Sequence, residues 1–108
     1  MQNITDLETL AAMSNEGALL VLFGGAQCSI CQSLRPRLTS LIDKYFPRMQ
    51  TVYIDCEASP EICAQHSVFS LPVVKVYIDG MLVVEDARAF SLNDLIERIE
   101  RPYAMWSG

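Results

Sequence analysis

Residues 18–36 read ALLVLFGGAQCSICQSLRP, and most of the information on the fold lies in this stretch. It opens with a continuous apolar run, residues 18–23, which Gly24 and Gly25 close. Such a run is too short for a typical helix and predicts a strand buried on both faces, as in sheets that helices cover. Cys28 and Cys31 follow at the start of the next helical pattern. The stretch therefore predicts a strand, a turn with two cysteines, and a helix.

The remaining chain continues this alternation of helices and strands. Pro36 lies inside the helix that follows the cysteines and should kink it before it ends at Phe46. Thr5 and Glu8 form a capping-box pattern that opens an earlier helix over about residues 6–15. The other expected elements, in chain order, are a strand over 50–55, a short helix from Ser59 to about His66, a hairpin of strands 73–78 and 81–85 around Asp79-Gly80, and a helix from Ser91 ended by Arg101-Pro102.

This order predicts an α/β fold. A strand–helix–strand unit forms a parallel pair, and the hairpin adds antiparallel strands to the same sheet. We expect one domain over residues 1–108, with a central mixed sheet of four to five strands, helices on both faces, and a tail over about 102–108.

Composition and charge exclude several classes of protein. The chain has 108 residues, 51% of them hydrophobic, and a mean hydropathy of +0.23, which indicates one folded domain. A net charge of −5 leaves no basic stripe for nucleic acid or an anionic membrane, and no apolar run nears the roughly 20 residues of a membrane span. The start, MQNITD, does not resemble a secretory signal. We expect a monomer in the cytoplasm. This compartment is reducing, so the four cysteines would not serve as structural disulfides.

The spacing of Cys28 and Cys31 points to thiol chemistry. Unpaired backbone N–H groups at a helix start favour an anion, and the thiolate is the form of cysteine that attacks a disulfide. Two intervening residues on a helical turn bring Cys31 under Cys28, where it can attack the resulting mixed disulfide. Half of a zinc site, with Cys56 and Cys63 as the other ligands, and an inert pair of thiols are the alternatives. We expect no metal. Structural zinc sites usually pair two close-spaced knuckles on loops, whereas six residues separate Cys56 from Cys63 and one of the two lies at a strand end.

These features together resemble the thioredoxin family over residues 4–99. Cys28-Ser29-Ile30-Cys31 matches the active-site motif of the family, Pro36 its helix-kinking proline, Pro72 its cis-proline, and Gly80 its hairpin glycine. The resemblance implies a thioredoxin-like fold and thiol–disulfide exchange with protein disulfides, with Cys28 as nucleophile and Cys31 as resolving thiol.

The same resemblance implies how partners bind. The Leu71-Pro72 bond should be cis and lie against the cysteine pair, so that Leu71 docks a substrate segment through its backbone. Gln27, Ser29 and Ile30 would line the contact. No bound cofactor is implied beyond a redox-active Cys28–Cys31 disulfide, and a flavoprotein of the thioredoxin-reductase type would supply electrons.

Several positions depart from the family pattern. Gln27 replaces a tryptophan, Ser29-Ile30 replaces Gly-Pro, Leu22 replaces a buried acid, Thr51 or Val52 stands where a lysine is usual, and Gly24-Gly25 replaces a Trp-Ala step. We expect a looser loop before Cys28 and slower or differently directed exchange. A thioredoxin-fold binding or assembly module remains an alternative. A glutaredoxin-like enzyme fits less well, because residues 81–87 lack the elements expected to hold glutathione.

Four further residues carry separate expectations. Cys56 and Cys63 are expected to be small apolar core residues, with a second redox pair as the alternative. His66 should be a solvated or capping histidine whose positive charge suits the helix end. Trp106 either folds back on the last helix or is exposed as a partner contact.

Overall fold

The computed structural model describes residues 1–87 and 91–108. Its elements are β1 (Gln2–Asn3), α1 (Leu7–Asn15), β2 (Ala18–Gly24), α2 (Ser29–Tyr45), β3 (Gln50–Asp55), α3 (Pro60–Gln65), β4 (Val73–Ile78), β5 (Met81–Ala87) and α4 (Leu92–Ser107). The predicted order is confirmed, with the short β1 added in front. Within the described ranges, no helix has the length and apolar character that crossing a membrane requires.

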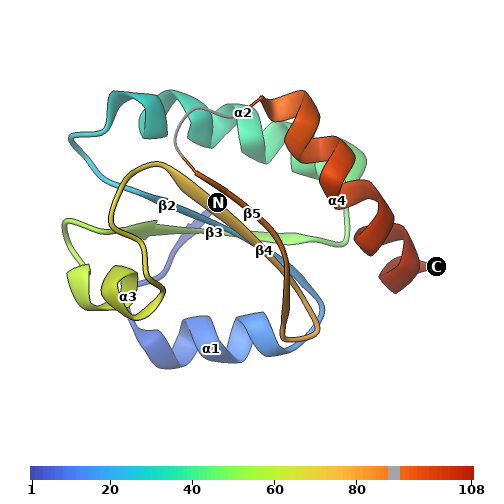
Figure 1. Cartoon of the computed structure of the whole chain (residues 1–108), viewed down its shortest axis with the longest axis horizontal. Helices are drawn as coiled ribbons and strands as arrows, with labels where there is room; N and C mark the ends of the chain where they lie inside the picture. Colours follow the sequence, from blue (N-terminus) through green and yellow to red (C-terminus); the bar gives the residue numbers. More distant parts are fainter. Residues whose placement is uncertain (88–90) are drawn as a thin grey trace.

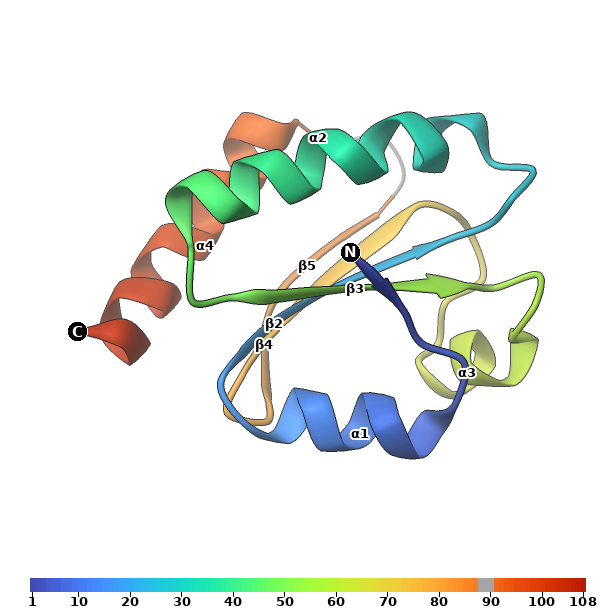
Figure 2. The ribbon, with the colours of Figure 1, turned by 180° about the vertical axis from the view of Figure 1, so that it is seen from behind.

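The five strands form one mixed sheet in the order β1-β3-β2-β4-β5. β1 and β2 both pair with β3 in parallel, whereas β4 pairs antiparallel with β2 and with β5. Helices α2 and α4 cover one face of the sheet, and α1 and α3 cover the other (Figure 1, Figure 2). Asp79 and Gly80 have φ values of 48° and 88°, which confirms the predicted tight turn. The predicted fold class is confirmed.

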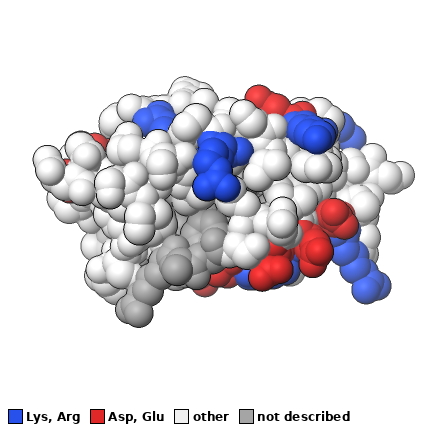
Figure 3. Space-filling view, turned by 90° about the horizontal axis from the view of Figure 1, so that it is seen from above, with Lys and Arg blue, Asp and Glu red and all other residues white. Residues whose placement is uncertain are grey.

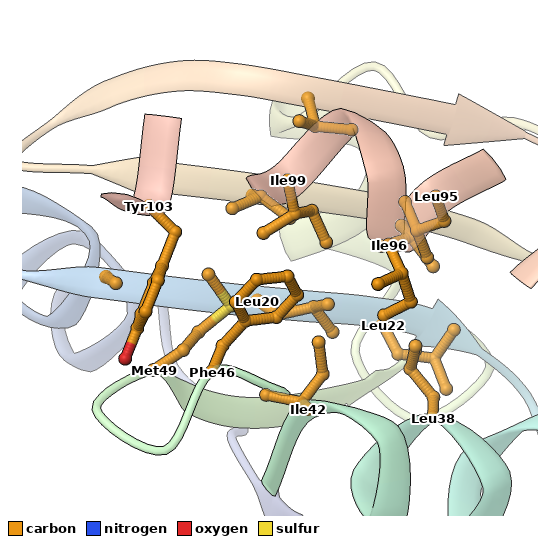
Figure 4. Close-up of a cluster of buried hydrophobic side chains, with 14 of the residues drawn as sticks. Leu20, Leu22, Leu38, Ile42, Phe46, Met49, Leu95, Ile96, Ile99 and Tyr103 are labelled. Carbon is orange, nitrogen blue, oxygen red and sulfur yellow. The ribbon is translucent and has the colours of Figure 1, made fainter. Parts of the chain in front are cut away.

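The central strand β2 explains why the sheet has a core on each face. All seven of its residues are buried, and successive side chains of a strand point to opposite faces. Leu20 and Leu22 pack against residues of α2 and α4, with Ile42, Leu95 and Tyr103 among them (Figure 4). Leu19, Val21 and Phe23 enter the second cluster, under α1 and α3. The apolar run thus holds both helix layers to the sheet.

The cap of α1 differs from the prediction by one residue. Asp6, and not Thr5, is the N-cap, and its carboxylate accepts a hydrogen bond from the Thr9 backbone N–H at 3.0 Å. The same carboxylate also accepts the Thr9 hydroxyl at 2.9 Å. Aspartate caps at least as well as threonine, so the two overlapping cap patterns could not be ranked from the sequence.

Helix α4 does not end at Pro102, as the sequence suggested, but continues to Ser107. An internal proline costs a helix about 3 kcal/mol, so tertiary contacts must stabilise the last turns. Tyr103 supplies them: its ring lies 4.9 Å from that of Phe46, and its hydroxyl accepts the Arg48 backbone N–H at 2.9 Å. The Arg48 guanidinium lies 4.6 Å from the ring centroid of Trp106. The expected tail is therefore part of the helix, and Trp106 folds back on the protein.

Candidate active site

One edge of the sheet gathers the residues that the sequence singled out. Gly24 at the end of β2 pairs with Asp55 at the end of β3, and Phe23 pairs with Val73 at the start of β4. The segments that leave β2 and β3 and the segment that enters β4 therefore meet at this edge (Figure 1, Figure 2). The cysteine motif follows β2, and Leu71-Pro72 comes directly before Val73.

Cys28 and Cys31 form a disulfide with their Cα atoms 5.2 Å apart. Cys28 is the N-cap of α2, and its sulfur accepts a hydrogen bond from the Cys31 backbone N–H at 3.3 Å. Cys28 is partly exposed, whereas Cys31 is fully buried. Only the first sulfur lies within reach of a partner molecule, and the helix start directs an N–H group at it.

The Leu71-Pro72 peptide bond is cis, as the resemblance implied. Pro72 is buried and Leu71 half-buried, and the pairing of Val73 with Phe23 sets this segment beside the end of β2. Gln27, Ser29 and Ile30 are exposed around the disulfide. Phe69, which no sequence pattern singled out, is 84% exposed and precedes the proline by three residues. A large aromatic side chain in a loop next to Pro72 was the available signal.

The prediction of a loose loop at Gly24-Gly25 is wrong, because both glycines are buried and closely packed. A Cβ at Gly24 would lie 2.7 Å from the Tyr53 hydroxyl oxygen and 2.9 Å from the Cβ of Cys31. A Cβ at Gly25 would lie 3.2 Å from the Glu57 side chain. The space that larger side chains would fill is taken by Tyr53 and Glu57 from the next strand and turn.

Cys56 and Cys63 form a second disulfide, with their Cα atoms 5.7 Å apart. The preferred prediction, two unpaired core residues, is therefore wrong, although Cys63 does belong to the core. The Cys56 backbone N–H donates to the Gly24 carbonyl at 2.8 Å, so this disulfide is attached to the same edge as the first. All four cysteine sulfurs lie in disulfides, which differs from the zinc arrangement. Across residues 1–87 and 91–108, no three His, Cys, Asp or Glu side chains gather as metal ligands.

His66 is the C-cap of α3, as the sequence suggested, but it does not supply the expected positive charge. Burial, together with the nearby Lys75 ammonium, lowers the pKa of His66 and favours its neutral form. Its ring lies 5.6 Å from that of Phe23, and its Nδ1 is 3.4 Å from the Tyr77 hydroxyl. Lys75, another residue that no sequence pattern singled out, is buried and donates to the His66 carbonyl at 2.6 Å. Both residues fix the segment between α3 and β4.

This geometry, a disulfide with one accessible sulfur at a helix start beside a cis-proline, defines a thiol–disulfide oxidoreductase. Comparison with known proteins agrees: the family model for thioredoxin matches residues 3–101. The chain is 25% identical to the thioredoxin-like protein YdfQ of Bacillus subtilis, covering 100% of this chain and 99% of that one. It is 26% identical to the thioredoxin of the same organism, covering 85% and 88% of the two chains.

A solved structure, a thioredoxin of Plasmodium falciparum, shares the fold, with a TM-score of 0.80, 23% identity, and coverage of 91% of this chain and 98% of that one. The chain belongs to the thioredoxin family. It is a protein disulfide oxidoreductase of the thioredoxin type and carries a redox-active disulfide, Cys28–Cys31. Thioredoxins act on disulfide-containing proteins and need no cofactor.

Proposed function

We propose that this protein reduces disulfides of other proteins with a Cys28/Cys31 dithiol, Cys28 acting as nucleophile and Cys31 as resolving thiol. The observation that carries the proposal is the unequal burial of the two sulfurs. Cys28 caps α2 and is partly exposed, and Cys31 is fully buried one helical turn further on. A disulfide of a partner protein can approach the first sulfur and not the second.

The exchange runs in two steps. The Cys28 thiolate attacks one sulfur of the partner disulfide, that disulfide breaks, and the other partner sulfur leaves as a thiolate that takes a proton from water. Cys31 then loses its proton and attacks the Cys28 sulfur, which closes the Cys28–Cys31 disulfide and releases the second partner thiolate. Two electrons pass from the dithiol to the partner. The N-terminal N–H groups of α2 favour the Cys28 thiolate.

Partner recognition would use the surface around Cys28. Leu71 would pair with an extended partner segment through its backbone, while Gln27, Ser29 and Ile30 contact the partner's side chains. Ile30 is 63% exposed, and the first charged side chain after Cys28 is Arg35. Figure 3, which looks onto α2 and α4, shows few charged side chains at the left end, where α2 begins. Glu57 lies nearby, against Gly25, but the small number of charged side chains at this end of α2 supports recognition by shape and backbone pairing rather than by charge.

The electron donor, compartment and assembly are part of the same proposal. A flavoprotein of the thioredoxin-reductase type would reduce Cys28–Cys31, and the protein would act as a monomer in the cytoplasm without a bound cofactor. The net charge of −5 supports a freely diffusing monomer, because charge away from zero opposes association. Cell fractionation and light scattering test the two statements: recovery with membranes, or a dimer mass at micromolar concentration, would contradict them.

Insulin reduction with dithiothreitol tests the proposal. The unsubstituted protein should accelerate the turbidity that reduced insulin chains produce, Cys28→Ser should abolish the acceleration, and Ser40→Ala, an exposed change further along α2, should retain it. Cys31→Ser should accumulate a mixed disulfide with a partner, visible on a non-reducing gel. Equal rates for the unsubstituted protein and Cys28→Ser would overturn the assignment.

A binding or assembly module with little redox turnover is the second candidate. Leu22, fully buried at the position where the family pattern has an acid, favours it, because no carboxylate there assists proton transfer. A redox titration of Cys28/Cys31 separates the candidates. A reversible couple near the cytosolic glutathione poise supports the exchange enzyme, and the absence of a reversible disulfide supports the module.

A further inference from the structure

Tyr53 lies close to the resolving cysteine, and the proposed exchange gives it no part in the chemistry. It sits in the middle of β3, where it pairs with Leu22, and only 3% of its surface is exposed. Its hydroxyl oxygen and the Cβ of Cys31 both lie within 3.0 Å of the place that a Cβ of Gly24 would occupy. Gly24 therefore leaves room for the Tyr53 hydroxyl and the Cys31 side chain to lie near the same point.

The hydrogen bonds of this hydroxyl leave its proton available. The Gln32 side-chain amide donates to the Tyr53 oxygen at 3.2 Å and to the Gly25 carbonyl at 3.1 Å. An amide nitrogen is only a donor, so the tyrosine oxygen is the acceptor in the first bond and its own O–H is free to donate elsewhere. The Cys31 side chain lies near the same point beside Gly24, and its sulfur can accept a hydrogen bond.

The hydroxyl keeps its proton at neutral pH. Burial raises the pKa of Tyr53, the Gln32 hydrogen bond lowers it, and among the charged groups Asp55 and Glu57 raise it while Arg35 lowers it, with a net rise. Arg35 lies against the ring, 4.1 Å from its centroid, and not against the sulfur. The raised pKa favours the neutral form of Tyr53, which can donate a hydrogen bond.

Cys31 needs such a donor. It is fully buried, and forming a thiolate away from water is unfavourable unless a hydrogen bond or a positive charge compensates. Leu22, the paired neighbour of Tyr53, supplies neither. In the oxidised state the Cys31 sulfur is held by its bond to Cys28. The requirement therefore arises only after that bond has opened.

We propose that the Tyr53 hydroxyl donates a hydrogen bond to the Cys31 sulfur in the reduced protein and stabilises the thiolate that resolves the mixed disulfide. This inference rests on the proposed exchange through Cys28 and Cys31. Cys31 releases its proton to water, the thiolate attacks the Cys28 sulfur, the Cys28–partner bond breaks, and the partner thiolate takes a proton from water. Tyr53 keeps its proton and forms no covalent bond. A neutral hydroxyl thus stands near Cys31, where the family pattern has a buried acid at the position of Leu22.

The test is a pH titration of Cys31 by its ¹³Cβ NMR shift, in a Cys28→Ser background so that a single active-site thiol titrates. The range is about pH 6 to 9, which lies below the usual pKa of tyrosine, so Tyr53 stays protonated. Tyr53→Phe should raise the Cys31 pKa by about one unit, a roughly 10-fold loss of thiolate at a given pH. Tyr45→Phe, on an exposed part of α2, is the matched control and should leave it unchanged.

A second variant disturbs the same place while keeping the tyrosine. Gly24→Ala, whose Cβ would crowd both the Tyr53 hydroxyl and the Cβ of Cys31, should also raise the Cys31 pKa. An unchanged or lower pKa in Tyr53→Phe overturns the proposal, as does a rise in Gly24→Ala alone. The titration requires no turnover, so an inactive protein in the insulin assay would overturn the exchange function while leaving this measurement to decide the hydrogen bond separately.

Discussion

Replacing Gly24 by alanine should destabilise the protein through two contacts at once. The added Cβ would lie 2.7 Å from the Tyr53 hydroxyl oxygen and 2.9 Å from the Cβ of Cys31, both closer than real Cβ atoms approach such neighbours. Overpacking in a buried site costs about 1–3 kcal/mol. Alanine also restricts the unfolded chain, which returns about 0.4–1 kcal/mol because the φ of Gly24 is not in the left-handed region. The net expected loss is about 1–2 kcal/mol.

Urea unfolding of the oxidised protein measures this loss, which should lower the midpoint by about 0.5–1 M. Gly25→Ala is the matched control: the three atoms nearest its new Cβ all belong to the exposed Glu57 side chain, which can move, so the free energy of unfolding should change by no more than about 0.5 kcal/mol. Adding Tyr53→Phe to Gly24→Ala removes the closer contact and should recover at least half of the loss, a coupling of about 0.5 kcal/mol or more. Equal effects of the two alanines, or no recovery, would refute the close approach of Tyr53 to this edge.

Three further changes test other parts of the structure. Tyr103→Phe removes the acceptor of the Arg48 backbone N–H and should cost about 1 kcal/mol in urea unfolding, whereas an unchanged midpoint would contradict the anchoring of α4. Because burial and a neighbouring lysine ammonium lower the folded-state pKa of His66, the unfolded chain binds this proton more readily, and stability is lost as the pH falls below about 6.5. His66→Gln should therefore flatten the stability profile between about pH 7 and pH 5, and a parallel profile would contradict it. Replacing both Cys56 and Cys63 by alanine should lower the oxidised protein's unfolding free energy by about 2 kcal/mol, and dithiothreitol should remove most of the difference. The intact mass of a Cys28→Ser, Cys31→Ser variant should fall by two hydrogen atoms on oxidation, and an unchanged mass would contradict the second disulfide.

The elements of the fold followed from local patterns, because they depend on residues close in sequence. The apolar run of β2 and the Asp79-Gly80 turn were each identified from a few neighbouring residues. The end of α4 was not, since Pro102 signals a helix end locally. Contacts with residues more than fifty positions away, of Tyr103 with Phe46 and of Tyr103 and Trp106 with Arg48, keep the helix intact.

In the candidate site, too, some features could be predicted from nearby residues and others depend on distant contacts. The positions of Cys28, Cys31 and Pro72 follow from spacing along the chain, and the structure sets them on one edge of the sheet. The packing at Gly24 could not be predicted, because a glycine pair alone does not show which distant side chain fills the space. The Cys56–Cys63 disulfide was only the alternative prediction, because free cysteines are usually buried core residues. Whether these two pair depends on how the turn after β3 folds back on α3.

The unequal burial of the two active-site sulfurs has a consequence for timing. In the proposed exchange, a bound partner is released by a group already held within the same molecule, at an effective concentration that dilution of the protein does not change. Capture of a partner through Cys28 would then be bimolecular and slow down as either protein becomes scarce, whereas release through the buried Cys31 would not. At low abundance the time between encounters lengthens, and the lifetime of each covalent complex stays the same.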